Sequence, residues 1–313
     1  MLRWIGIVAV TVGLGGCAAR PMRTLVSYER EPWTFARSSA SKLTTRHYEI
    51  YTTMRDEVLV GALPGFVEAA YEHYTQLLPP SRPPAEKMKV FLFASRGEWE
   101  AFTRRFAGPR AAVLLKVRNG GYSEGGVSVI EYVRHEITFP LFAHEGFHQY
   151  VHHCVNGRLP AWLNEGLAVY CEGQRWGQDG LRCFDPWYNP LRRNDLATAV
   201  LAGRLHRLSR LLQTNAGEMI EGSSQSVATY YAQLWALVLF LQHGAKGKYA
   251  TDFQRLLRSL ADGDVERHAR AVHIWSARPT FSFGEDLFRA YISEDLESVE
   301  REYVAFIREK FLN

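Results

Sequence analysis

The segment HEGFHQY at residues 144–150 carries the residue types of a hydrolytic metal site. Side chains four residues apart lie on the same face of a helix, so a helical segment directs His144 and His148 to a common point. Two neutral imidazoles at that point can bind one metal ion. Glu145 then lies beside the metal, where it can act as a general base on a water without being a ligand. We therefore expect a hydrolytic metal centre built on these three residues.

A catalytic metal of this kind needs a third protein ligand, and Glu165 in the segment WLNEGLAVY can supply it. The connection NGRLPAW between the two segments is short enough to bring two helices side by side. A carboxylate among apolar neighbours is costly unless a positive group pairs with it, and a zinc ion would be that partner. These apolar neighbours are Trp162, Leu163, Leu167 and Ala168.

The motifs HEGFH and WLNEGLA together resemble those of the gluzincins, the superfamily of thermolysin-like and aminopeptidase-like zinc metallopeptidases. The nearest likeness is to short bacterial lipoprotein members. The resemblance implies that Zn²⁺ is bound by His144, His148 and Glu165, with Glu145 as the catalytic base. It also implies a zincin-like α+β fold, in which a small mixed β-sheet with an antiparallel edge strand packs on the active-site helix and the carboxyl-terminal half is mostly helical. The implied activity is hydrolysis of peptide bonds.

Two further features follow from this resemblance. Gluzincins place a tyrosine or histidine opposite the zinc to stabilise the oxyanion, and in the segment YAQLWALVLFL this role would fall to Tyr231, with Tyr230 as the competing candidate. The family also binds an extended peptide along an antiparallel edge strand, and NGGYSEGG at residues 119–126 lies where that strand is expected. A flexible hairpin tip is the alternative reading of these glycines.

The sequence departs from the gluzincin pattern in two respects. The thermolysin branch carries an aspartate four residues past the glutamate ligand to orient a zinc histidine, and here that position is Val169. A partner for the histidine must therefore come from elsewhere in the chain. The aminopeptidase branch's motif for recognising a free amino terminus has no counterpart, which argues against aminopeptidase activity.

Two other histidines need separate interpretations. His152 continues the stripe of His144 and His148, but the glycine turn and later histidine that would make it a ligand are missing. We expect His152 to face solvent or to pack against neighbours. His135 begins HEITF, which lacks a second histidine, and we expect it in a loop or at the end of a strand.

The first residues, MLRWIGIVAVTVGLGGCAAR, have the pattern of an export signal that is too short to span a membrane. Its LGGC sequence resembles the lipobox of bacterial lipoproteins, which predicts a signal peptide at residues 1–16 and lipidation of Cys17. A plain cleavable signal is the alternative. We expect a lipid-anchored protein of the cell envelope, on the outer membrane and facing the periplasm. With a net charge of +4 and no long run of like charge, nucleic acid is not an expected partner.

We expect one catalytic domain at residues 47–313, preceded by a tether at residues 17–46 that is rich in Ser, Arg, Thr and Pro. Residues 47–157 should form an α/β half, with strands in HYEIYTTM and KMKVFLFAS and a helix from about residue 138 to 156. Residues 158–313 should be almost wholly helical.

Export places the remaining cysteines in an oxidising compartment. Cys171 and Cys183 flank a polar loop that a disulfide could pin, whereas Cys154 lies in an apolar helix and is expected to be a buried thiol.

The sequence therefore predicts a zinc-dependent metallopeptidase that acts on a peptide or protein substrate. Two alternatives remain open: a noncatalytic envelope lipoprotein that keeps the fold and serves as a binding scaffold, and a zinc amidase that acts on cell-wall peptides. An intact Glu145 argues against the scaffold, because a scaffold does not need a base beside the metal.

Overall fold

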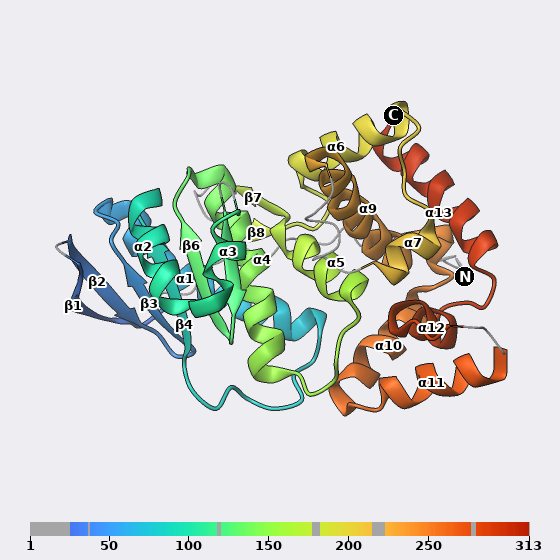
Figure 1. The fold of residues 1–313 in the computed structure, drawn as a ribbon, viewed down its shortest axis with the longest axis horizontal. Helices are drawn as coiled ribbons and strands as arrows, with labels where there is room; N and C mark the ends of the chain where they lie inside the picture. Colours follow the sequence, from blue (N-terminus) through green and yellow to red (C-terminus); the bar gives the residue numbers. More distant parts are fainter. Residues whose placement is uncertain are drawn as a thin grey trace, which may run out of the picture.

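The chain folds as an α+β protein with a mixed sheet at one end and a helical half at the other (Figure 1). The computed structural model describes residues 26–36, 38–117, 120–176, 182–214, 223–276 and 280–312. The predicted signal peptide and Cys17 lie outside these residues. None of the helices in the described ranges is long and apolar enough to cross a membrane.

The sheet has six strands in the order β1-β2-β3-β4-β6-β5. Its centre is parallel, because β3 pairs with β4 and β4 pairs with β6 in the same direction, while β1, β2 and β5 run antiparallel to their neighbours. The expected strands in HYEIYTTM and KMKVFLFAS are confirmed, and β5 is an antiparallel edge strand within residues 119–126, as predicted. The strands are β1 (Glu29–Phe35), β2 (Ser38–Thr44), β3 (Tyr48–Thr52), β4 (Met88–Phe93), β5 (Gly121–Glu124) and β6 (Val127–Glu131).

The expected tether at residues 17–46 is wrong for its second half, because β1 and β2 form a hairpin that extends the sheet. Two aromatic side chains of β1 attach the hairpin to β4. The ring centre of Trp33 lies 6.0 Å from that of Phe91, and the ring centre of Phe35 lies 4.9 Å from that of Phe93. Contacts with β3 and β4, rather than local composition, therefore order this segment.

Four helices accompany the sheet. Ser95 caps α2, since its side chain accepts a hydrogen bond from the backbone N–H of Glu98. The helix predicted from about residue 138 is α4, which begins at His135 and ends at Cys154. These helices are α1 (Glu57–Leu77), α2 (Arg96–Phe106), α3 (Ala111–Leu114) and α4 (His135–Cys154).

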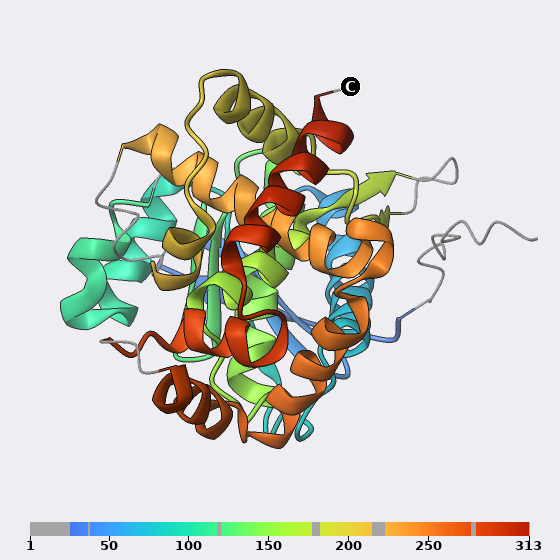
Figure 2. The ribbon, with the colours of Figure 1, turned by 90° about the vertical axis from the view of Figure 1, so that its right-hand side faces the viewer.

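The described residues of the second half are mostly helical, as predicted, and they include a short hairpin of β7 and β8. Figure 2 shows α13 running across the outer side of this half. Its elements are α5 (Ala161–Glu172), β7 (Gln174–Trp176), β8 (Arg182–Phe184), α6 (Pro190–Leu201), α7 (Leu208–Gln213), α9 (Ser224–His243), α10 (Ala250–Asp262), α11 (Val265–Ser276), α12 (Phe283–Tyr291) and α13 (Leu296–Phe311).

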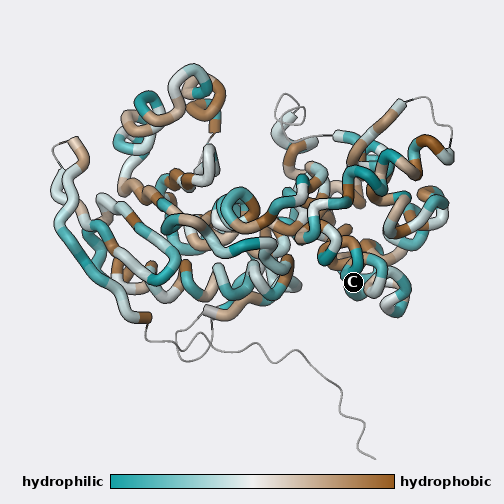
Figure 3. Tube along the Cα trace, turned by 90° about the horizontal axis from the view of Figure 1, so that it is seen from below, coloured by the Kyte–Doolittle hydropathy of each residue, from teal (hydrophilic) through white to brown (hydrophobic). Residues whose placement is uncertain are grey.

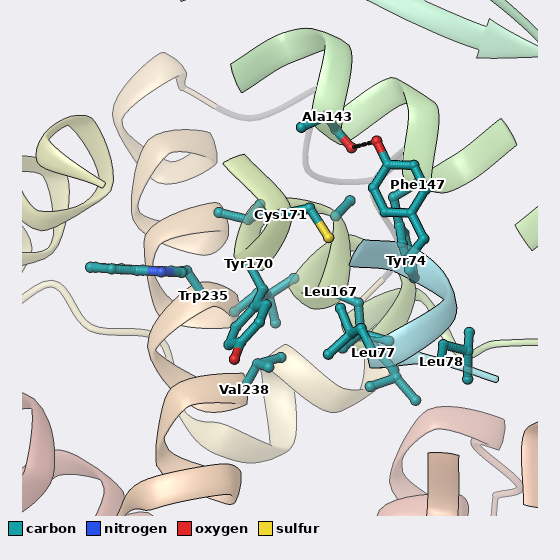
Figure 4. Packing of buried hydrophobic residues seen from close by; sticks show 14 of the residues in the cluster. Tyr74, Leu77, Leu78, Ala143, Phe147, Leu167, Tyr170, Cys171, Trp235 and Val238 are labelled. Carbon is teal, nitrogen blue, oxygen red and sulfur yellow. Dashed lines mark hydrogen bonds between the residues drawn. The ribbon is translucent and has the colours of Figure 1, made fainter. Parts of the chain in front are cut away.

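The main hydrophobic core is continuous through both halves, and α4, α5 and α9 lie at its centre. Figure 4 shows this packing, with Tyr74 of α1 donating a hydrogen bond to the carbonyl of Ala143 at 2.9 Å. The outer helices mix hydrophobic and hydrophilic residues along their length (Figure 3). In α10, for example, one side of the helix is exposed and the other buries four apolar side chains. The buried side chains are Phe253, Leu256, Leu257 and Leu260.

The predicted disulfide between Cys171 and Cys183 is not formed, and both residues are free thiols. Phe184 of β8 points towards α1, where its ring stacks on His73. Successive side chains of a strand point in opposite directions, so Cys183 points away from α1. Cys171 is fully buried in the core against α1, and the two sulfur atoms therefore face different surroundings. Cys154 is a buried thiol, as expected.

Close packing of α5 on α9 depends on Gly166. A Cβ atom at this position would lie 2.9 Å from Cγ2 of Val238 and 3.2 Å from the carbonyl oxygen of Leu234. We expect Gly166→Ala to lower the free energy of unfolding by about 1–3 kcal/mol, because the two helices must move apart. Urea denaturation measures this effect.

The matched control is Gly61→Ala in α1, where no atom lies within 4 Å of the added Cβ. This variant should gain about 0.5–1 kcal/mol, because alanine favours the helix. Equal effects at the two positions would contradict the close approach of α5 and α9.

Candidate metal centre

Helix α4 positions the two histidines of the HEGFH motif. It packs against β5 and β6 on one side and against α5 on another. Gln149 fastens it to the sheet by donating hydrogen bonds of 2.8 Å to the carbonyls of Lys89 and Gly126. The Nε2 atoms of His144 and His148 lie 3.2 Å apart. The expected geometry of the pair on one helical face is confirmed.

Glu165 reaches the same point from α5. Its Oε2 atom lies 3.5 Å from Nε2 of His144 and 3.5 Å from Nε2 of His148. Ligands about 2.1 Å from a tetrahedral metal ion are separated from one another by about 3.4 Å. The spacing of the three atoms therefore fits three corners of a tetrahedron around one divalent cation, and among the described residues His144, His148 and Glu165 are the group that could hold a metal ion.

The metal-free site holds protons tightly. Burial by itself lowers the pKa of His144, but hydrogen bonds with Glu165 and Glu172 outweigh it and raise the pKa to about 10. The pKa of His148 is also raised, because the negative charge of Glu165 outweighs burial. Burial raises the pKa of Glu165, yet the two imidazoles bring it well below its usual value. The site thus attracts positive charge, which protons or a metal ion can supply.

Glu145 is buried beside this group, with 8% of its surface exposed. Burial is the largest cause of the raised pKa of its carboxyl group, with the charges of Glu165 and Glu172 adding to it and the two imidazoles opposing it. A buried carboxylate whose pKa is raised above its usual value binds a proton more readily, which suits a group that accepts a proton and releases it again. The position and chemistry of Glu145 therefore suit a general base.

Glu172 is a site residue that the sequence analysis missed. Its Oε1 atom accepts a hydrogen bond from Nδ1 of His144 at 2.9 Å, which leaves Nε2 free to bind a metal. Glu172 supplies the partner that Val169 cannot. Because it follows Glu165 by two helical turns on the same face of α5, this spacing was the signal that could have revealed it.

Tyr231 lies at the metal group and Tyr230 does not. The ring centre of Tyr231 is 6.1 Å from that of His144, whereas the hydroxyl of Tyr230 donates a hydrogen bond of 3.2 Å to the carbonyl of Thr214. Burial, followed by the charges of Glu165 and Glu145, raises the pKa of Tyr231 well above its usual value. The phenol of Tyr231 therefore keeps its proton and can donate it in a hydrogen bond.

The remaining histidines are outside this group. His152 is exposed, as expected, and is not part of the candidate metal-binding group. The prediction that His135 lies in a loop or at a strand end is wrong, since it is the first residue of α4, with Nδ1 located 2.9 Å from the hydroxyl of Tyr132.

No family model matches the chain, and no curated protein or solved structure matches it either. The gluzincin resemblance therefore rests on the motifs HEGFH and WLNEGLA.

Zinc and protons should compete for this site. Since the pKa of His144 rises from 6.5 to about 10 on folding, its contribution to the stability of the metal-free protein is complete below pH 6.5 and is lost as the pH rises towards 10. Zinc must displace these protons, so its affinity should rise with pH, by about tenfold per unit for each proton released. Thermal unfolding of the metal-free protein and zinc titration between about pH 6.5 and 9.5 measure both trends.

His152→Ala, which removes an exposed histidine of the same helix, should follow the unchanged protein in both measurements. A zinc affinity that does not change with pH would contradict the proton-binding site described above.

Proposed function

We propose that this protein is a zinc-dependent metallopeptidase with a zincin-like fold of the gluzincin type. The observation that carries the proposal is the triangle of ligand atoms from His144, His148 and Glu165, with sides of 3.2, 3.5 and 3.5 Å. Two imidazole nitrogens and one carboxylate oxygen are a donor set that suits zinc better than the harder cations. The packing of α4 on β5 and β6 supports the zincin-like fold.

A zinc ion held by these three residues would polarise the scissile carbonyl and lower the pKa of water at its open position. Glu145 would accept a proton from the attacking water and pass it to the leaving amine. Its burial supports this role, because the raised pKa of the carboxyl group lets it hold the proton between the two steps.

Tyr231 would donate a hydrogen bond to the oxygen that gains negative charge in the tetrahedral intermediate. Its ring lies beside His144, and its phenol remains protonated at the pH of the cell envelope because of its raised pKa. Tyr230 is unsuited to this role, since its hydroxyl already bonds to Thr214.

The substrate would be a peptide chain bound in an extended form. β5 is an edge strand that packs against α4, so a peptide that adds to this edge would run close to the helix of the metal ligands. The LGGC sequence supports export and lipidation at Cys17, which would place the enzyme on the outer membrane facing the periplasm.

Glu145→Gln should abolish turnover while zinc remains bound, because glutamine keeps the shape of the side chain and loses the base. We expect kcat for casein, a quenched peptide or a cell-wall peptide to fall by about 10²–10⁴-fold. Glu136→Gln, at an exposed position of the same helix, is the control and should change nothing.

These assays also separate the alternatives. Turnover of cell-wall peptides alone would favour the amidase. Bound zinc with no turnover of any of these substrates, in the unchanged protein as well as in Glu145→Gln, would contradict the peptidase and favour a binding scaffold.

Tyr231→Phe should lower kcat by about 10²–10³-fold with little change in KM, because the lost hydrogen bond forms in the transition state. Tyr230→Phe should keep its activity and lose about 1 kcal/mol of stability with the bond to Thr214. Steady-state kinetics and urea denaturation measure these effects. A larger loss of kcat in Tyr230→Phe than in Tyr231→Phe would contradict the assignment.

A further inference from the structure

Arg192, in the first turn of α6, contacts two side chains of the candidate metal centre, Glu172 and Tyr231. We propose that Arg192 is a positioning residue for the proposed hydrolysis: it fixes Glu172, and through it the metal ligand His144, while it lies against the ring of Tyr231. This inference rests on the proposed function, and it concerns a residue outside both motifs.

The contact between Arg192 and Glu172 is bidentate. Nε of Arg192 donates to Oε2 of Glu172 at 3.0 Å, and Nη2 donates to Oε1 at 2.9 Å. Two parallel hydrogen bonds fix the plane of the carboxylate as well as its position, which a lysine cannot do. In this orientation, Oε1 of Glu172 also accepts the hydrogen bond from Nδ1 of His144. Arg192 therefore sets the direction in which His144 presents Nε2.

Asn189 holds both partners of this pair. Its Oδ1 atom accepts a hydrogen bond of 3.2 Å from the backbone N–H of Arg192 and so caps α6, while its Nδ2 atom donates to Oε2 of Glu172 at 3.0 Å. The fixed start of α6 thereby places the guanidinium at Glu172. Because α6 packs on α9, it also places the guanidinium beside Tyr231.

The second contact of Arg192 is with Tyr231 itself. The guanidinium carbon lies 5.3 Å from the centre of the tyrosine ring, within the range of a cation–π interaction. One side chain therefore restrains both a ligand of the metal and the proposed oxyanion donor, which come from helices α4 and α9.

Stability alone does not account for this arrangement. The side chains of Arg192 and Glu172 are 16% and 8% exposed, and a buried ion pair is often no more stabilising than apolar side chains of the same volume. The role of the ion pair is to orient the side chains of Glu172 and His144. Loss of the partner that orients a metal-binding histidine typically weakens metal affinity by about 10–100-fold.

The test compares Arg192→Lys, Arg192→Met and the control Arg193→Met. Lysine keeps the buried charge and so preserves folding, but it cannot form the bidentate contact. Arg193 is the next residue of the same helix, and it contacts Lys310 and Phe311 instead. We expect zinc dissociation constants, measured by competition with a chelator, to rise by about 10–100-fold in Arg192→Met and by a smaller factor in Arg192→Lys, and to stay unchanged in Arg193→Met.

Two further readouts distinguish positioning from a general structural role. In the metal-free protein, the Nδ1–H proton of His144 should give a slowly exchanging NMR signal that is lost in Arg192→Lys. The same substitution should lower kcat by a larger factor in the presence of Tyr231 than in a Tyr231→Phe background, because part of its effect passes through the position of the Tyr231 hydroxyl, which phenylalanine lacks.

The inference would be overturned if the wild-type protein binds zinc and Arg192→Lys has the same zinc affinity and an unchanged NMR signal from His144. That result would leave the proposed function intact. If Arg192→Lys lowered kcat by the same factor with Tyr231 and with Tyr231→Phe, the claim that Arg192 also positions Tyr231 would be overturned. Failure of the wild-type protein to bind zinc would instead overturn the proposed function, together with the positioning role that rests on it.

Discussion

Charge balance within a buried volume is the constraint on which the candidate metal centre depends. Glu145, Glu165 and Glu172 bring three carboxylates to one place, and Arg192 supplies one fixed positive charge. When the carboxylates are ionised, two negative charges remain, and burial makes them costly. Either two protonated imidazoles or one divalent cation with neutral imidazoles balances them. The raised pKa values of His144 and His148 in the metal-free protein correspond to the state with two protonated imidazoles.

The surrounding fold serves this balance by holding the charged groups on rigid elements. α4 is fixed to the sheet through Gln149 and to α1 through Tyr74, and α5 approaches α9 closely at Gly166. Each candidate ligand thus comes from a helix, whose position is determined by core packing, and not from a loop. Preorganisation of this kind reduces the conformational cost of assembling a metal centre.

The sequence predicted the parts of the site that depend on local periodicity. The spacing of His144 and His148 required only a helix, and Glu165 required only a second helix after a short turn. The bidentate ion pair of Arg192 with Glu172 was missed because it joins α5 and α6, which are brought together by core packing. An acidic residue two turns past Glu165 was nevertheless visible in the sequence.

Errors elsewhere in the fold have the same origin. The hairpin of β1 and β2 has the composition of a linker, and its place in the sheet comes from the pairing of β2 with β3 and from the aromatic contacts of Trp33 and Phe35 with β4. The disulfide prediction failed because the direction of Cys183 depends on the phase of β8, which the spacing of cysteines does not contain.

A crystal structure of the zinc-loaded protein, with anomalous diffraction at the zinc edge, tests the central claim most directly. The predicted result is one zinc ion about 2.0–2.2 Å from Nε2 of His144, Nε2 of His148 and a carboxylate oxygen of Glu165, with a non-protein atom as its fourth ligand. A zinc ion without Glu165 as a ligand, or with a fourth protein side chain bound to it, would contradict the claim.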